Sequence, residues 1–188
     1  MNTIKSRVAK DVLFIQGGGE KGYEADAKLA ASLQQALGEV YNVYYPSMQT
    51  NEVEADFGWT EQIGKELSKT NDEVILVGHS LGASMLLKFL SENKIRNNIA
   101  GIFLLSTPFW SGDEDWVKGL RLKEDFANNL PKSIPVFLYH CRDDEEIPFE
   151  HLAIYKQKIP YATAREITSG GHQYNNHLTI IAKDIKSL

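Results

Sequence analysis

The sequence has 188 residues, of which 43% are hydrophobic and 24% are charged, and its net charge is −5. This length and composition are typical of one globular domain that buries a complete core, so we expect a single domain over residues 1–188. The acidic balance and the lack of a Lys or Arg cluster exclude an obvious nucleic-acid binding surface, and we expect no nucleic-acid partner.

No targeting or membrane signal stands out. The N-terminal ten residues are basic, but the apolar run that follows covers only residues 12–15 and is too short for a signal peptide. No run approaches the roughly 20 apolar residues of a membrane-spanning helix, so we expect no membrane partner. The single cysteine, Cys141, excludes an internal disulfide and is typical of a cytoplasmic protein.

Short apolar runs rich in β-branched residues alternate with segments of helical periodicity along the chain. The runs predict strands at residues 11–16, 40–45, 73–77, 99–106, 134–140 and 164–167. The periodic segments predict helices at residues 23–37, 59–67, 83–89, 148–159 and 174–188, whereas residues 109–132 are expected to be irregular. Strands separated by helices predict an α/β fold, in which helices cover both faces of a mostly parallel, doubly wound sheet.

The sharpest functional signal lies where the third predicted strand meets the helix after it. Residues 78–82 read Gly-His-Ser-Leu-Gly and leave no room for a loop. The two glycines suit a crossing where any Cβ would collide, and Ser80 lies at the bend with its hydroxyl pushed out beside a helix N-terminus. A G-x-S-x-G pattern between a strand and a helix predicts a nucleophile elbow.

Functional groups on such a sheet gather where the parallel strands end. The sequence has a glycine run at residues 17–19, Ser80, the pair Asp143 and Asp144, and His172 just after four of the predicted strands. Serine, then carboxylate, then histidine is the chain order of the triad in α/β-hydrolases. We therefore expect these side chains to meet at one edge of the sheet.

A serine hydroxyl needs a base to remove its proton, and the base needs a partner that fixes its tautomer. His172 is the predicted base, because Gly170 and Gly171 before it let the ring reach across the sheet edge; the alternative is a solvated loop histidine. The other histidines are expected elsewhere. We expect the ring of His79 to point away from the site, that of His140 to be packed, and those of His151 and His177 to lie on the surface.

The third member of the triad is Asp144 or Asp143, both in the acidic run at residues 143–146. We favour Asp144, since it lies in the loop shortly before Pro148 starts the next predicted helix. Because four acids follow one another, either aspartate also suits a helix cap or a solvated loop.

The oxyanion formed in acyl transfer needs backbone N–H donors. The N–H of Leu81, directly after the nucleophile, is the first expected donor. The second is expected from the glycine run, with Gly18 preferred and Gly19 as the alternative, because glycine lets the backbone approach a substrate closely.

These motifs together resemble the α/β-hydrolase superfamily and, more narrowly, the small serine hydrolases of the retinoblastoma-binding-protein-9 type. The resemblance rests on the compact length, the glycine run, and the motifs at residues 78–82, 144–148 and 170–172. It implies a minimal three-layer fold with no separate cap domain, whose six strands lie in the order 2-1-3-4-5-6. It also implies the triad Ser80, Asp144 and His172. One departure is Gln16-Gly17 after the first strand, where many members have His-Gly.

Cofactor motifs are matched only in part. Residues 17–22 fit G-x-G-x-x-G, as in dinucleotide-binding proteins, but the second strand ends at Tyr45 without the acid that binds a ribose. Lys21 is followed by Gly22 rather than by Ser or Thr, so a phosphate-binding P-loop is not matched either. No set of His, Cys or Asp has zinc spacing. We expect neither a cofactor nor a metal.

The sequence thus predicts a serine hydrolase that acts on a small or medium carboxylic ester or thioester. Four aromatic side chains near the strand ends are candidates to line the substrate pocket, although aromatic residues equally suit core packing. They are Trp110, Phe109, Trp59 and Tyr23. The alternative is a protein-binding module on the same fold with little turnover, which would have a protein partner.

Overall fold

The computed structural model describes residues 9–71 and 73–188. The interpretation of the basic N-terminal segment falls on residues 1–8, which lie outside the described residues. The apolar run after that segment forms the first strand, β1 (Lys10–Ile15). None of the described helices combines the length and the apolar character needed to cross a membrane.

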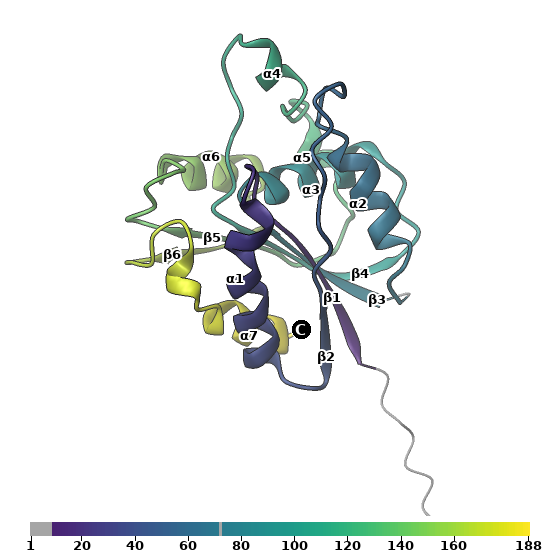
Figure 1. Cartoon of the computed structure of the whole chain (residues 1–188), viewed down its shortest axis with the longest axis vertical. Helices are drawn as coiled ribbons and strands as arrows, with labels where there is room; N and C mark the ends of the chain where they lie inside the picture. Colours follow the sequence, from purple (N-terminus) through teal and green to yellow (C-terminus); the bar gives the residue numbers. More distant parts are fainter. Residues whose placement is uncertain (1–8, 72) are drawn as a thin grey trace, which may run out of the picture.

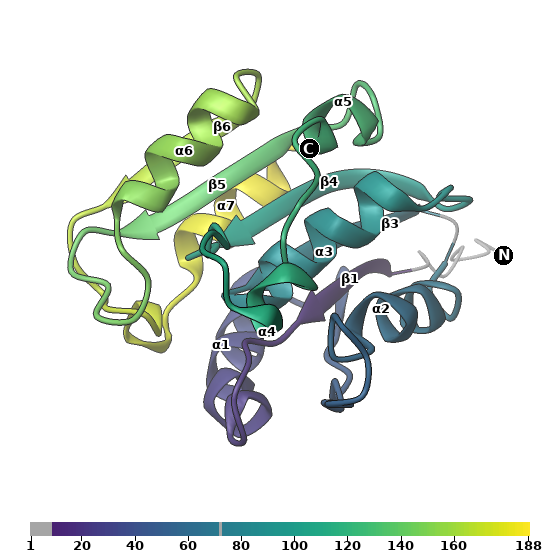
Figure 2. The same ribbon diagram turned by 90° about the horizontal axis from the view of Figure 1, so that it is seen from above.

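Six strands form one parallel sheet in the order β2-β1-β3-β4-β5-β6, which confirms the predicted order. After β1, the strands are β2 (Tyr41–Tyr44), β3 (Glu73–His79), β4 (Asn98–Leu105), β5 (Val136–Cys141) and β6 (Thr163–Ile167). Because every neighbouring pair is parallel, the carboxyl ends of the strands lie along one edge, to which the arrowheads point in Figure 2.

Helices cover both faces of the sheet (Figure 1). One face packs against α1 (Gly22–Leu37) and α7 (Thr179–Lys186) through a core that includes Val12, Phe14 and Val77. The other face packs against α2 (Trp59–Leu67), α3 (Leu81–Glu92) and α6 (Glu150–Lys158). Successive residues of β1 alternate between these two cores, as expected for a strand buried on both sides.

Two segments differ from their prediction. The helix expected over residues 174–188 is divided into a single 3-10 turn, η1 (Tyr174–Asn176), and the shorter α7. All three residues of that turn have a positive φ, which a right-handed α-helix does not accommodate. The irregular stretch over residues 109–132 contains two four-residue helices, α4 (Asp115–Lys118) and α5 (Phe126–Asn129), and α4 stands farthest from the sheet in Figure 1.

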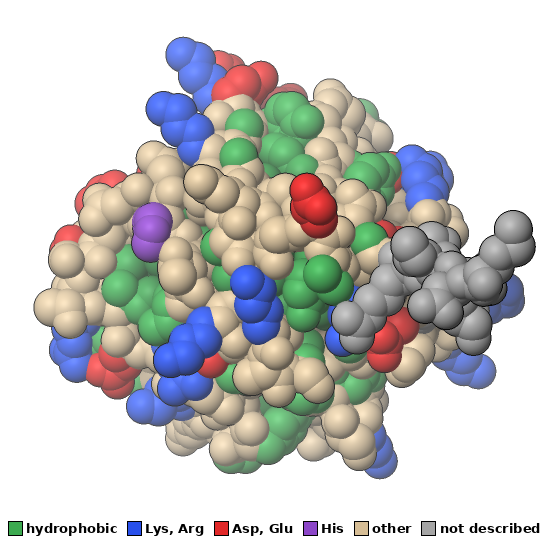
Figure 3. Space-filling view, turned by 90° about the horizontal axis from the view of Figure 1, so that it is seen from below, with side chains coloured by type: hydrophobic (Ala, Val, Ile, Leu, Met, Phe, Trp, Pro, Cys, Tyr) green, Lys and Arg blue, Asp and Glu red, His purple; other side chains and the backbone are tan. Residues whose placement is uncertain are grey.

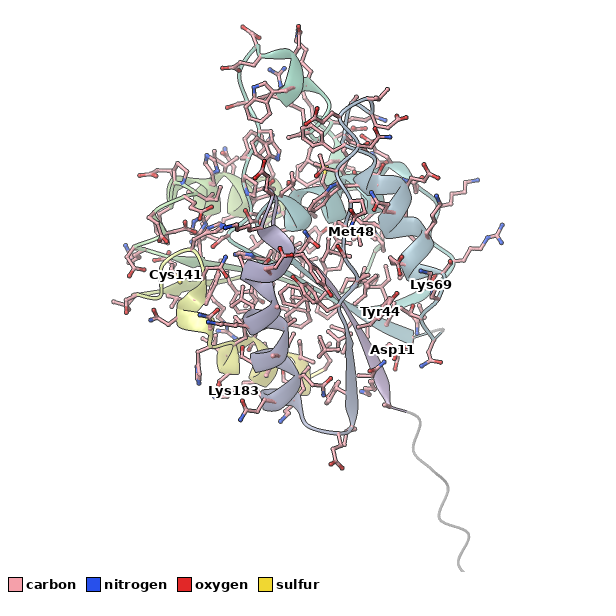
Figure 4. All side chains as sticks on the ribbon, in the orientation of Figure 1. Asp11, Tyr44, Met48, Lys69, Cys141 and Lys183 are labelled. Atoms are coloured by element: carbon pink, nitrogen blue, oxygen red, sulfur yellow. The ribbon has the colours of Figure 1, made fainter. Side chains whose placement is uncertain are left out.

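Polar contacts tie edge strand β2 to the segments around it. Glu66 accepts hydrogen bonds from Tyr44 of β2 and from Lys69, both labelled in Figure 4. The amide of Met48, just beyond β2, donates to the side chain of Gln16 at 2.9 Å. The end of β1 is thereby held against the loop that follows β2. On the face of the molecule in Figure 3, basic and acidic side chains are scattered between hydrophobic side chains and the remaining surface.

The bend between β3 and α3 brings three backbones into contact. A Cβ on Gly82 would lie 2.1 Å from the carbonyl oxygen of Gln16, and one on Gly78 would lie 2.6 Å from the Cα of Ala83. Real Cβ atoms do not approach other atoms this closely, so both positions require glycine. The start of α3 therefore rests directly on the end of β1, as a nucleophile elbow requires.

We expect Gly82→Ala to destabilise the protein by about 3 kcal/mol, the upper end of typical overpacking costs, because the colliding atom belongs to buried backbone. Urea unfolding measures the loss. The matched control is Gly64→Ala in α2, whose Cβ would meet only the edge of the Phe89 ring at 3.0 Å and would gain helix propensity. A Gly82→Ala protein as stable as the wild type would contradict the packing described for the bend.

Candidate functional site

Ser80 occupies a strained position at the bend. Its φ of 51° and ψ of −124° lie outside the regions that non-glycine residues favour. Such strain persists only where the surrounding structure imposes it, and it is concentrated at functional sites. Ser80 is the residue just before α3, and its side chain borders a small cavity at the carboxyl edge of the sheet.

The cavity has a volume of about 200 Å³ and brings several predicted residues together. Ser80, Gly18 and His172 all line it, although they are separated along the chain. The remaining lining is mostly small or polar. It comprises Gly17, Lys21, Gly22, Ala25, Asp26, His79, Glu146 and Gln173.

Two backbone amides beside Ser80 are available to a ligand. A Cβ on Gly18 would lie 2.8 Å from Cδ2 of Leu81, so these two residues are in direct contact. Within the described chain, neither the amide of Gly18 nor that of Leu81 donates a hydrogen bond. Leu81 is the first residue of α3, where amides have no partner inside the helix and attract negative charge.

His172 lies against Asp144. Its Nδ1 is 3.0 Å and 3.1 Å from the two carboxylate oxygens, and both side chains are almost completely buried. Burial alone would lower the pKa of His172, but the hydrogen bond and the charge of Asp144 outweigh it and raise the pKa above its usual value. The contact also requires the proton on Nδ1, which leaves Nε2 as the basic nitrogen, 3.5 Å from the carboxylate of Glu146 in the cavity lining.

The carboxylate of Asp144 contacts a second histidine and two backbone amides in addition to His172. It accepts hydrogen bonds from the amides of Glu146 and Ile147, and Nε2 of His140 lies 3.3 Å away. Burial would raise the pKa of Asp144, but the hydrogen bonds from His140, His172 and Ile147 hold it well below the usual range. His140 is packed, as expected, but its contact with Asp144 is not apparent from the sequence.

The neighbouring acids have a different task. The carboxylate of Asp143 accepts the amides of Gly170 and Gly171, each at 2.9 Å, and that of Glu145 accepts the amide of His172 at 2.9 Å. These bonds lower the pKa of Asp143. The acidic run therefore holds the loop around His172, and Asp144 alone among these three acids meets the ring.

Ser80 and His172 are not hydrogen-bonded to each other in the part of the chain that the structure describes. Instead, Nε2 of His172 lies 3.5 Å from a carboxylate oxygen of Glu146. The side chain of Glu146 is 62% exposed and long, so it is free to turn into solvent. Catalytic hydrogen bonds are often incomplete without substrate, so this arrangement keeps Ser80 and His172 as candidates.

The four aromatic residues expected in the pocket do not line this cavity. Trp59 is 1% exposed and packs in the core, and Tyr23 stacks on Tyr45 with ring centroids 4.7 Å apart. The burial of Trp59 differs from the expectation, whereas a substrate contact for Tyr23 stays a prediction. Trp110 donates from its indole to Ser84 on α3, and Phe109 packs edge-on against Tyr155. A substrate contact for Trp110 or Phe109 stays a prediction.

The expectations from the sequence do not include Asp26, nor the contacts of His79 with Asp26 and His172. His79 lines the same cavity as Ser80, and its ring lies against the ring of His172, with centroids 4.6 Å apart. Its Nδ1 is 2.7 Å from the carboxylate of Asp26 on α1. A signal exists in the sequence, because Asp26 has helical spacing with the buried residues Ala30, Leu33 and Leu37. Of the remaining histidines, His177 is exposed, and His151 is half-buried and accepts the amide of Phe109.

Solved structures share this fold over nearly the whole chain. A variant of the meta-cleavage product hydrolase CumD has a TM-score of 0.76 at 14% identity, with 96% of this chain and 92% of that chain covered. Est1E from Butyrivibrio proteoclasticus with bound ferulic acid has a TM-score of 0.71 at 17% identity, with 100% and 90% covered. The thioesterase domain from the curacin biosynthetic pathway has a TM-score of 0.66 at 15% identity, with 96% and 92% covered. These neighbours establish the α/β-hydrolase fold.

A family model gives the more specific assignment. The model of the serine hydrolase family matches residues 26–177, which is most of the chain, and the chain therefore belongs to that family. A search of curated proteins gives no match. The predicted place in the α/β-hydrolase superfamily is confirmed, and the narrower retinoblastoma-binding-protein-9 type is consistent with the family.

We expect the pKa of His172 to lie above the ordinary histidine value of about 6.5, and to fall in Asp144→Asn. The amide removes the negative charge that favours the imidazolium but leaves the burial that opposes it. An NMR titration of the ring protons measures both values. Asp143→Asn is the matched control, since it leaves Asp144 in place. An unchanged titration in Asp144→Asn would show that the carboxylate does not control the ring.

Proposed function

We propose that this serine hydrolase cleaves small carboxylic esters or thioesters through a covalent acyl-enzyme. One observation carries the proposal: Ser80 and His172 border the same cavity, while the other ring nitrogen of His172 is bound by Asp144. A strained serine, a histidine with one nitrogen facing the cavity, and a buried carboxylate are the groups that acyl transfer requires.

In the proposed mechanism, the Ser80 oxygen attacks the substrate carbonyl carbon while Nε2 of His172 takes the hydroxyl proton. Asp144 stabilises the resulting imidazolium through Nδ1–H. His172 then returns the proton to the leaving group, which departs and leaves an ester on Ser80. A water molecule repeats the sequence and releases the acid. Glu146 must turn away from Nε2 in the first step, and its exposure allows this.

The oxyanion of the tetrahedral intermediate is assigned to the amides of Leu81 and Gly18. Their contact and their lack of other acceptors among the described residues support this assignment. One such donor typically lowers the barrier by about 3–4 kcal/mol. Gly17 is unsuitable, because its amide already donates to Asp26 at 2.6 Å.

The cavity favours a small acyl group. Its volume of about 200 Å³ is below the roughly 300–1,000 Å³ of sites for drug-sized ligands. Trp110 is partly buried against α3 and Phe109 is partly buried against Tyr155 of α6, and we keep both as candidates for contact with a larger leaving group. More than one kind of substrate is compatible with the fold, since its neighbours include Est1E with bound ferulic acid and a thioesterase domain.

Cys141 has no part in the proposed reaction. It lies at the end of β5, fully buried, on the side of the sheet that faces α7 (Figure 4). Burial and the nearby carboxylates of Asp143 and Asp144 raise the pKa of its thiol to about 12, so it is not a nucleophile at neutral pH. A buried free thiol is compatible with the cytoplasmic location that we propose.

We expect Ser80→Ala to lower ester turnover to the background rate and to abolish labelling by a fluorophosphonate probe, while the protein stays folded. The reason is that alanine has no nucleophile. An assay with p-nitrophenyl acetate measures turnover, gel fluorescence measures probe labelling, and circular dichroism checks that the protein is folded. Ser91→Ala on the same helix is the control, since among the described residues that hydroxyl bonds only the carbonyl of Lys88. Turnover that persists in Ser80→Ala would refute the nucleophile assignment.

We expect Asp144→Asn to reduce kcat by about 10⁴, as loss of the correct imidazole tautomer does in serine hydrolases with this triad. Asp143→Asn should change kcat by less than about tenfold, because its amide oxygen still accepts a hydrogen bond from Gly170 or Gly171. Steady-state kinetics of both variants measure the contrast. The reverse order of effects would transfer the triad role to Asp143.

A protein-binding module with little turnover is the second candidate. The position of Glu146 favours it, since this carboxylate and not Ser80 faces Nε2 of His172. A binding module would also have a protein partner. The fluorophosphonate experiment separates the two functions, because a folded wild-type protein that resists labelling would favour the binding module.

A further inference from the structure

A second histidine–carboxylate pair lies beside the proposed triad. Asp26 on α1 and His79 at the end of β3 have side chains that are 1% exposed, and their atoms approach to 2.7 Å. Burial of such a pair is unfavourable unless further hydrogen bonds replace its hydration. The reaction proposed for Ser80 uses neither residue directly. The pair therefore has another task.

Three groups contact the carboxylate oxygens of Asp26. Its Oδ2 accepts the amide of Gly17 at 2.6 Å in addition to Nδ1 of His79, and its Oδ1 accepts the side-chain amide of Gln173 at 3.1 Å. These bonds outweigh burial and lower the pKa of Asp26. One carboxylate thus joins the glycine run after β1 to the segment that follows His172.

His79 continues this connection. Its Nε2 donates to the backbone carbonyl of His172 at 3.0 Å, and its ring packs on the ring of His172. The two ring nitrogens of His79 therefore face two oxygen acceptors, the carboxylate of Asp26 and the carbonyl of His172. Tyr174 also meets this ring edge-on, at a centroid distance of 6.2 Å.

We propose that Asp26 and His79 form a positioning pair that aligns the glycine run and the His172 loop around Ser80. The inference rests on the proposed function. By accepting the amide of Gly17, Asp26 fixes the Gln16–Gly17 peptide, one residue before the Gly18 amide, and so positions Gly18 against Leu81. By binding the carbonyl of His172, His79 holds the backbone of the proposed base.

The first test compares Asp26→Ala with Asp184→Ala. Asp184 is an equally structural carboxylate, bound by Tyr139 and Arg165 and outside the lining of the Ser80 cavity. We expect both variants to lower Tm, but only Asp26→Ala to lower kcat, by about 10²-fold with KM changed less than about threefold, similar to the loss of one oxyanion donor. Equal loss of kcat in both variants, or wild-type kcat in Asp26→Ala, would overturn the proposal.

Asp26→Asn covers the case in which the alanine variant does not fold. Its amide oxygen can still accept from Gly17, and its NH₂ group can face Gln173, whose side-chain oxygen lacks a partner within the described residues. We expect this conservative variant to fold, to lose the charge that supports His79, and to retain kcat within about tenfold of the wild type, since the Gly17 contact survives. A kcat about 10²-fold below that of the wild type in a folded Asp26→Asn protein would overturn the role of the Gly17 contact.

Amide hydrogen exchange separates failure of this inference from failure of the proposed function. We expect the Gly17 amide to exchange at least about tenfold faster in Asp26→Ala, with the amides of β4 unchanged, because the loop opens locally. Unchanged protection of Gly17 would overturn the positioning role. A wild-type protein that neither turns over esters nor labels contradicts the proposed function, and the exchange result still decides whether the pair holds the loop.

Discussion

The close packing of the N-terminus of α3 on the end of β1 is the constraint on which the site depends. Gly82 lies so near the carbonyl of Gln16 that no side chain fits between them. This contact forces the chain to turn at Ser80 without an intervening loop, and the strain in the serine backbone is the result. It also places the first amide of α3 next to Gly18. The position of the nucleophile and the direction of the free amides therefore have one cause.

Charge at this edge of the sheet is satisfied mainly by backbone. Asp143 and Glu145 bind the amides around His172, and Asp144 binds two amides of its own loop as well as the ring. Asp26 likewise accepts a backbone amide, that of Gly17 in the glycine run after β1. Buried carboxylates are tolerated when hydrogen bonds replace their hydration, and here those bonds also order the loops. The same hydrogen bonds therefore stabilise the buried carboxylates and fix the conformation of the loops.

Much of the architecture could be predicted because its signals are local. Alternating strand and helix patterns indicated the parallel sheet, and the family resemblance supplied the strand order. The position of Ser80 followed from two glycines at fixed spacing. Contacts between distant segments were harder. Asp26 resembles an ordinary helical acid until its spacing with Leu33 is considered, and nothing local shows that Trp59 is core. The left-handed turn at residues 174–176 depends on tertiary packing that propensity does not describe.

The acidic run at residues 143–146 has a consequence for how this loop can vary. Each carboxylate there meets a different atom or amide of the His172 loop. Asp143 binds the amides of two glycines, Asp144 binds Nδ1 of His172, Glu145 binds the His172 amide, and Glu146 lies near Nε2 of His172. These assignments follow the order of the chain, residue by residue. Exchange of one acid for its amide leaves the other three acids at their own partners, whereas an inserted or deleted residue shifts every later carboxylate along the loop. The spacing of these acids therefore matters to the site as much as their identity.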